Sequence, residues 1–443
     1  MATVGRDLVS HEDPNVIQCV YDAVQKKLDS GPFPEQVHHL LRQPLESASH
    51  RVLLIWDALD ECTDNEDRNW LCDLITQLPQ FPTSLSILIT SRPEIDLESV
   101  RLRLFECKQI RHRDLTFRPG SDSSTLRDID TYTAHRFDQI KARQRMDRAW
   151  PGEEALKQLS IKIDGLFIVA SFFCRFIDYY RCEDRLKRLL ETPSHFGDDN
   201  DYHYYRTGLQ HLFKGDSSEE VNDRQAIVGV ILVAQYPLTT NVLAKFAGVT
   251  SGVTKKIIET LYPFLVQAEA SEETVSGAWH FMHESVSDFL ASHHAGDFRI
   301  DLANASAALA MPCLQILCSE IEDAFARCDK TFKPRVMDGD VVAAGLPNVS
   351  EGLKYACRFW AYHLKDVTTL NRPLEDLLND FFTHHLLKWL HVMGRFRWLN
   401  AAISGLEWME NWKVSYYSVL FIRIQAHRLI AVCFQTRPCR ART

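Results

Sequence analysis

The fold class of this chain follows from residues 51–96, which read RVLLIWDALDECTDNEDRNWLCDLITQLPQFPTSLSILITSRPEID. Five apolar residues, Val52–Trp56, lead directly into an acidic segment, and a second apolar run, Leu85–Ile89, ends in Thr90-Ser91-Arg92. Short continuous apolar runs are typical of strands buried on both faces of a parallel sheet. A helix expected at 66–78 separates the two runs, so we predict a β-α-β crossover unit.

Three acidic residues follow the first predicted strand: Asp57, Asp60 and Glu61. Ligands of open α/β sheets bind at the carboxyl ends of the strands, and a carboxylate there can hold Mg²⁺. Asp57 is therefore the candidate metal ligand, and Asp60 or Glu61 is the candidate residue that orients or deprotonates an attacking water. The alternative is that the three acids only solvate the strand end and cap the next helix.

Arg92 ends the second predicted strand and is a candidate phosphate contact. Its planar guanidinium suits phosphate oxygens, which it can bind through two N–H groups at once. The alternative is a structural ion pair with one of the acids that follow the first strand.

A phosphate-binding loop of the form Gly-x-x-x-x-Gly-Lys-Ser/Thr occurs nowhere in the 443 residues. Such a loop supplies backbone N–H groups and a lysine to the phosphates and a hydroxyl to the metal. Without it, the acidic groups alone would repel a triphosphate. The segment Ser30-Gly31-Pro32 does not replace it, because proline has no N–H to donate.

Several segments carry a resemblance to a known family. The runs LLIWDALDEC and ILITSRPE resemble the Walker B and sensor segments of NACHT-domain signalling NTPases, as found in fungal NLR-like (STAND) proteins and in the nephrocystin-type N-terminal NTPase region. Supporting matches follow in family order: LRDI at 126–129, GLFIVA at 165–170, HFMHES at 280–285 and YACRFW at 355–360.

The resemblance implies roles for two further residues and a nucleotide, ATP or GTP with Mg²⁺. Phe167 lies in Gly165-Leu166-Phe167, the segment that packs beside adenine in relatives, although an aromatic in a helix is more often a core residue. His283 lies in Met282-His283-Glu284, which is similar to the Met-His-Asp motif whose histidine contacts a phosphate of ADP. The alternative for His283 is a residue that joins a strand to the next helix.

The family places its phosphate loop before the segment that matches residues 10–50. We therefore expect a chain truncated before the Walker B segment, and the second explanation is a pseudo-NTPase paralogue.

The predicted fold is α/β followed by mainly α, in four domains. These are a partial NACHT core with a P-loop-type parallel sheet at 1–118, a helical domain at 119–217, a winged helix at 218–300 and a C-terminal helical region at 301–443. The segments RPGSDSS at 118–124 and Gly215 to Asn222 are the expected boundaries. Further helices are expected at 14–29, 34–46, 124–145, 151–163, 165–180, 183–191, 202–214, 223–235, 239–247 and 252–262, and short strands at 263–268 and 277–282.

Composition narrows the partners and the compartment. The net charge of −9 gives no basis for binding nucleic acid or an anionic membrane, and the predicted winged helix has five Lys/Arg against ten Asp/Glu, so we expect no DNA binding. The twelve cysteines lack zinc-ligand spacing and suit reduced thiols in a cytoplasmic protein. No apolar stretch approaches the length of a membrane-spanning helix.

Two functions remain open from the sequence. The first is a NACHT/STAND-type signalling or scaffold protein that forms homo-oligomers or associates with related NACHT proteins, with an NTPase-like fold that lacks independent activity. The second is a residual ATP- or GTP-binding NTPase that uses Asp57 with Mg²⁺.

Overall fold

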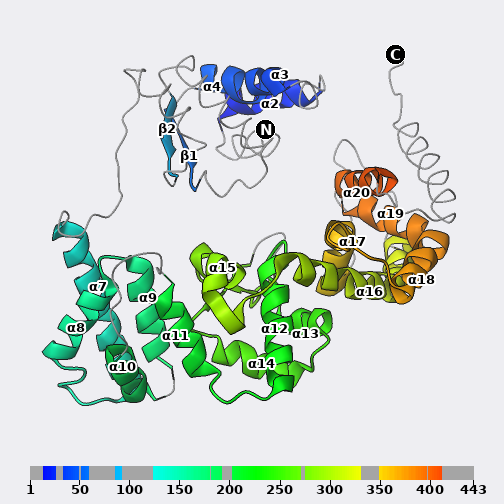
Figure 1. The fold of residues 1–443 in the computed structure, drawn as a ribbon. Helices are drawn as coiled ribbons and strands as arrows, with labels where there is room; N and C mark the ends of the chain where they lie inside the picture. The colour runs from blue at the N-terminus through cyan, green and yellow to red at the C-terminus, as the bar shows by residue number, and fades with distance from the viewer. Residues whose placement is uncertain are drawn as a thin grey trace, which may run out of the picture. The chain divides into compact units, whose positions relative to one another are not determined.

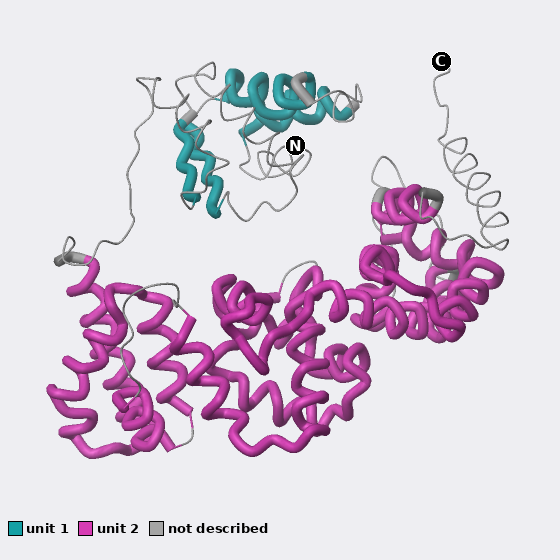
Figure 2. The backbone as a smooth tube through the Cα atoms, viewed as in Figure 1, with its two compact units in different colours: residues 1–116 teal, residues 117–443 magenta. Residues whose placement is uncertain are grey.

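The computed structural model describes residues 13–25, 33–48, 51–58, 85–91, 123–179, 181–191, 202–270, 275–330, 349–396 and 398–411. The chain divides into two compact units, Met1–Thr116 and Phe117–Thr443 (Figure 2). The described residues are mainly helical, with two small sheets (Figure 1). The helix predicted at 66–78 lies outside them. The finer domain boundaries, at 217/218 and 300/301, stay predictions.

The first unit combines a helical layer with a two-stranded parallel sheet. Its helices are α2 (Pro14–Gln25) and a continuous helical stretch made of α3 (Phe33–Val37), the π-helical turn η2 (His38–Arg42) and α4 (Gln43–Glu46). Strands β1 (Val52–Trp56) and β2 (Leu85–Ile89) pair in parallel, from Val52 opposite Leu85 to Trp56 opposite Ile89. The helices pack on the sheet through one apolar cluster, formed by Val16, Val37, Leu41 and Leu45 against Val52, Leu54 and Trp56.

The prediction that both strands are buried on both faces is wrong in the described structure. Side chains alternate along a strand, so one face carries Val52, Leu54 and Trp56 toward the helices. On the other face, the exposed fractions are 57% for Leu53, 58% for Ile55 and 51% for Leu88. The described helices of this unit cover one face of the sheet, which explains the difference.

The second unit begins with five helices at the predicted places: α7 (Ser123–Gln144), α8 (Glu153–Ile163), α9 (Phe167–Ile177), α10 (Cys182–Glu191) and α11 (His203–Leu212). Helix α9 is apolar on most sides and supplies much of the core, including Phe172 and Phe176. The buried carboxylate of Asp178, just after α9, accepts a hydrogen bond of 2.8 Å from Arg143 of α7. This charged contact ties the two helices together.

Three helices and an antiparallel hairpin follow in sequence order. They are α12 (Ser218–Val233), α13 (Thr240–Ala247), α14 (Ser251–Thr260), β3 (Leu265–Gln267) and β4 (Trp279–Phe281), with Leu265 opposite Phe281. The helix expected at 223–235 begins earlier, at Ser218, within the polar segment 215–222 that is expected to be a boundary. Ser217 and Glu220 form a reciprocal capping box that starts the helix. Helix α15 (Glu284–Ala291) and the 3₁₀ segment η6 (His293–Phe298) complete this part.

The C-terminal part is helical and rich in aromatic residues, as predicted. It contains α16 (Leu302–Lys330), α17 (Glu351–Leu364), α18 (Arg372–Asp380), the π-helical turn η7 (Phe381–His385), α19 (Leu386–Arg395) and α20 (Leu399–Asn411). Trp360, Phe381 and Trp389 are fully buried and contact one another, with ring centroids 4.9 to 5.9 Å apart. The indole N–H of Trp389 donates to the carbonyl of Cys357 at 3.0 Å.

One stretch of the described residues, His293–Cys328, is long and apolar enough to cross a membrane by length and composition. It includes most of α16, which packs against α12, α17 and α19. Leu309, Leu314 and Leu317 of α16 are buried in the main core of the second unit. Helix α16 therefore joins α12 to the C-terminal helices and contributes to the core of that unit.

Candidate functional site

The carboxyl ends of β1 and β2 bring two oxygen-bearing side chains together. Because the strands run in parallel and in register, Asp57 follows β1 next to Thr90, which follows β2. The Thr90 hydroxyl donates to Asp57 Oδ1 at 2.5 Å and accepts the backbone N–H of Ala58 at 2.8 Å. The backbone N–H of Thr90 donates to the carbonyl of Trp56 at 2.9 Å, which continues the ladder past the strand end. The edge is thus fixed by three hydrogen bonds.

The residue after Asp57 has a left-handed backbone conformation. Ala58 has φ of 52°, in the left-handed region that costs a non-glycine residue about 1–2 kcal/mol. The hydrogen bond from its N–H to Thr90 holds this conformation. Asp57 is exposed at the edge of the sheet.

The donor set at this edge fits a hard cation. Asp57 and Thr90 offer carboxylate and hydroxyl oxygens, the ligand type that Mg²⁺ prefers, and one carboxylate oxygen of Asp57 makes no hydrogen bond to the described residues. Because Mg²⁺ usually keeps several of its waters, one or two protein oxygens are enough to position it. Asp60, Glu61 and Arg92 lie outside the described residues, and their roles stay predictions.

Phe167 opens helix α9 after a tight turn. Asp164 and Gly165 have positive φ of 47° and 75°, which reverses the chain between α8 and α9. The Phe167 ring is 47% exposed and meets the ring of Tyr132 edge-on, with centroids 5.9 Å apart. The alternative that Phe167 is a core residue therefore does not hold, and its contact with a nucleotide base stays a prediction.

His283 lies where β4 passes into α15 and has a definite local role. It is the N-cap residue of α15, and its Nδ1 accepts the backbone N–H of Ser285 at 3.1 Å. The Ser285 hydroxyl lies 2.9 Å from His283 Nδ1 and 2.9 Å from the hydroxyl of Tyr205 on α11. His283 is thus linked to the helical part of the unit through Ser285. Its predicted phosphate contact stays a prediction.

Two polar groupings in the second unit were not predicted from the sequence. The first is a buried chain of hydrogen bonds in which His363 lies 3.0 Å from Ser306 Oγ through Nδ1 and 2.7 Å from the Tyr355 hydroxyl through Nε2. The second brings Cys318, Asp380 and His385 together, with one ligand atom from each lying within 4.8 Å of the others. Both join residues far apart in the sequence, so motif spacing gives no signal for them.

Comparison with known families gives one match. The family model described as nephrocystin 3, N-terminal, matches residues 3–92, which contain the described helices and strands of the first unit. That segment is therefore similar to a nephrocystin-type N-terminal region. No curated protein and no solved structure matches the chain.

Proposed function

We propose that this chain is a cytoplasmic signalling or scaffold module of the NACHT/STAND type, which acts by forming homo-oligomers or by associating with related NACHT proteins. The observation that carries the proposal is the edge of the parallel sheet, where Asp57 and Thr90 meet. It supports the proposal because the segments that bear these two residues resemble the Walker B and sensor segments of that family. The match of residues 3–92 to the nephrocystin 3 N-terminal model supports it. Strands β1 and β2 then belong to a P-loop-type sheet, and residues 218–300 form a winged helix.

The proposed winged helix serves as a protein-interaction element and does not bind DNA. The two lysines of α14 both lie near carboxylates, since Lys255 is 3.9 Å from Glu259 and Lys256 is 3.6 Å from Glu220. A net negative segment whose lysines are paired in this way repels a phosphate backbone. The same net negative charge would also repel an anionic membrane.

A second function is favoured by the carboxylate oxygen of Asp57 that makes no hydrogen bond to the described residues. In this alternative the chain binds ATP or GTP through Mg²⁺ held at Asp57, as a residual NTPase. When bound, the metal would neutralise phosphate charge, while Asp57 holds it and Thr90 fixes the orientation of Asp57. The scaffold is preferred because no Gly-x-x-x-x-Gly-Lys-Ser/Thr segment is present in these 443 residues.

The two functions are separated by measuring nucleotide binding and molar mass on the same samples. Wild type, Asp57→Ala and the control Asp22→Ala, which changes an exposed acid on α2, are titrated with a fluorescent ATP or GTP analogue and Mg²⁺. Light scattering then gives the mass over a range of concentrations. We expect concentration-dependent oligomers in all three proteins and no nucleotide binding that depends on Asp57.

Nucleotide binding that is absent, or equal in wild type and Asp57→Ala, would overturn the nucleotide-binding alternative. Micromolar binding that is lost in Asp57→Ala but kept in Asp22→Ala would establish the nucleotide-binding alternative. A monomer at every concentration, with no mass increase on addition of a related NACHT protein, would overturn the scaffold.

A further inference from the structure

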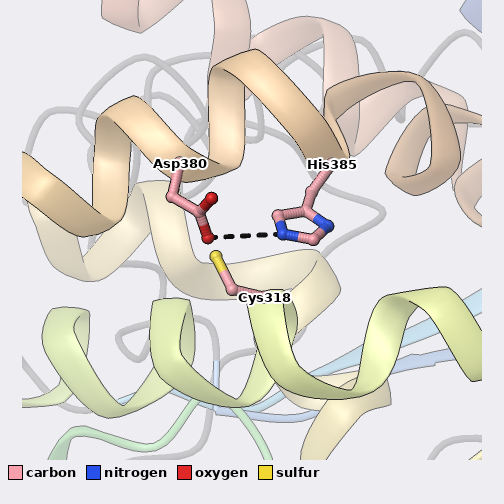
Figure 3. Close-up of side chains that lie close together, drawn as sticks. All are labelled: Cys318, Asp380 and His385. Carbon is pink, nitrogen blue, oxygen red and sulfur yellow. Dashed lines mark ion pairs between the residues drawn. The ribbon is translucent and has the colours of Figure 1, made fainter.

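A compact group of sulfur, oxygen and nitrogen donors lies between α16 and the turn that joins α18 to α19. It consists of Cys318 of α16, Asp380 at the end of α18 and His385 at the end of η7 (Figure 3). Figure 3 shows the three side chains pointing toward one another from two helical segments. We call this group the C-D-H cluster. Its residues take no part in the proposed function.

The π-helical turn η7 makes the cluster possible. Residues five apart in an α-helix are separated by about 140° around the axis, so Asp380 and His385 would point to different sides. The wider turn of η7 brings both His384 and His385 to Asp380, with Asp380 Oδ1 2.9 Å from His384 Nδ1 and Asp380 Oδ2 3.3 Å from His385 Nε2. Single π-turns within α-helices are rare and are frequent at functional sites.

The other side of the His385 ring faces a second carboxylate. Glu322 lies one turn after Cys318 on α16, and its Oε1 is 3.8 Å from His385 Nδ1. That nitrogen is buried and has no hydrogen-bond partner among the described residues. The Glu322 carboxylate also pairs with Lys388 of α19, which holds it in place. His385 therefore has its Nε2 toward Cys318 and Asp380 and its Nδ1 toward Glu322.

We propose that Cys318, Asp380 and His385 bind a zinc ion. Thiolate, imidazole and carboxylate are the three ligand types of protein zinc sites, whereas Mg²⁺ and Ca²⁺ take oxygen ligands. Bonds of about 2.0–2.3 Å place the ligand atoms of a tetrahedral zinc ion about 3.3–3.8 Å apart. The Asp380–His385 pair already has this separation, at 3.3 Å.

The surroundings of the cluster suit a site with three protein ligands and one water. The His385 side chain is 11% exposed and that of Asp380 is 45% exposed, so the cluster is closed on the histidine side and open to solvent at the carboxylate. Thiolate and carboxylate together carry the two negative charges that balance Zn²⁺. A carboxylate at the second nitrogen of a metal-bound histidine, the position of Glu322, fixes the ring and raises its basicity.

Zinc at this place ties α16 to the α18–α19 turn. The metal would join the long helix α16 to the shorter helical segments α18 and η7 through ligands on both sides. Because the ligands are brought together only in the folded chain, binding favours the folded state.

The test uses the full chain, purified without metal, and Co²⁺ as a spectroscopic substitute for Zn²⁺. We expect a near-ultraviolet thiolate-to-cobalt charge-transfer band in wild type that disappears in Cys318→Ser and persists in Cys328→Ser, which changes another buried cysteine of α16.

Competition with a chromophoric chelator then measures zinc affinity. His385→Ala should weaken it by at least about 100-fold, because loss of an outer-shell partner alone costs about 10–100-fold. The exposed control His391→Gln should leave it unchanged.

A stability measurement distinguishes loss of metal from loss of fold. Added zinc should raise the thermal midpoint of wild type but not that of Asp380→Asn, a variant of nearly the same shape, and far-ultraviolet circular dichroism checks that each variant is folded. The proposal is overturned if wild type gives no charge-transfer band, or if the band survives in Cys318→Ser.

Discussion

His363 is a titratable side chain with no access to solvent. It is fully buried on α17. Its Nδ1 makes a hydrogen bond with the hydroxyl of Ser306 on α16, and its Nε2 makes one with the hydroxyl of Tyr355. The Tyr355 hydroxyl in turn accepts the backbone N–H of Gln235, which follows α12. Burial lowers the pKa of His363 to about 4, against a smaller opposing effect of Asp366. The ring is therefore neutral near neutral pH and links three helices.

We predict that His363 makes the second unit sensitive to acid. The pKa of His363 is about 4 in the folded chain, against the ordinary histidine value of 6.5, so between these two pH values the unfolded chain binds a proton that the folded chain does not. The free energy of unfolding is therefore highest above about pH 6.5. It falls by about 3 kcal/mol as the pH drops toward 4. Below about pH 4 the folded histidine also binds its proton, and this loss stops.

The measurement compares urea unfolding of wild type and His363→Gln at about pH 7 and about pH 4.5. Glutamine keeps one donor and one acceptor but does not titrate. Wild type loses unfolding free energy at the lower pH through His363, and His363→Gln does not. The difference in unfolding free energy between the two proteins should therefore be about 2–3 kcal/mol smaller at the lower pH. The exposed His391→Gln is the control, and a gap that does not change with pH would show that His363 is not responsible.

Single residues show how far sequence reasoning reaches. The place of Asp57 at the end of a strand was predictable from an apolar run followed by an acid, and its neighbour Thr90 follows from parallel pairing. The role of Asp57 as a metal ligand stays a prediction. The C-D-H cluster was not predictable. Cys318 and His385 are far apart in the sequence, and only the packing of α16 against a π-helical turn brings them together.

At the scale of the elements, Arg175 joins α9 to the end of α14. Its guanidinium donates to the carbonyls of Tyr262 at 2.7 Å, of Pro263 at 3.3 Å and of Leu265, and it lies over the Tyr262 ring at 4.6 Å. These carbonyls lie just beyond the C-terminus of α14, where the helix dipole favours a positive charge. One side chain thus connects the first helices of the second unit with the β3–β4 part.

We predict that Arg175→Met destabilises the chain by about 2–4 kcal/mol, because a hydrogen bond to a charged group contributes about 1.5–3 kcal/mol and the carbonyls lose their donor. Methionine keeps an apolar stem against Tyr262, so the change isolates the polar contacts. Urea unfolding measures the effect. Lys187→Met, which changes a lysine side chain that is 75% exposed, should stay within about 0.5 kcal/mol of wild type. An equally small effect for Arg175→Met would show that α9 and α14 are held by apolar packing alone.

Helices were easier to predict than strands and boundaries. The apolar periodicity and the helix-end residues of α7 to α11 placed all five helices within a few residues of their observed bounds. The start of α12 was missed although Ser217 and Glu220 have capping-box spacing, because the polar composition of 215–222 resembled a linker. The burial of β1 was overestimated, since an apolar run shows what a strand can bury and says nothing about which elements cover it.

At the scale of the whole molecule, the two units differ in the size of their cores. One continuous apolar cluster runs through the second unit, from Ile129 to Met409. The described residues of the first unit form two small clusters, and among them Leu53, Ile55 and Leu88 of the sheet are exposed. Because stability depends on the apolar surface that a unit buries, we expect the second unit to fold without the first.

The last prediction tests this independence directly. Residues 117–443 produced alone should give a helical circular dichroism spectrum and one cooperative urea transition that Trp fluorescence also reports, because Trp360 and Trp389 are fully buried in its core. Residues 1–116 alone should aggregate, since the exposed sheet face can associate with other copies. Replacing Leu53 and Ile55 with threonine should reduce that aggregation in light scattering, whereas Val24→Thr, on the exposed side of α2, should have less effect. A second unit that unfolds gradually, or aggregates as readily as the first, would mean that its core depends on residues before 117.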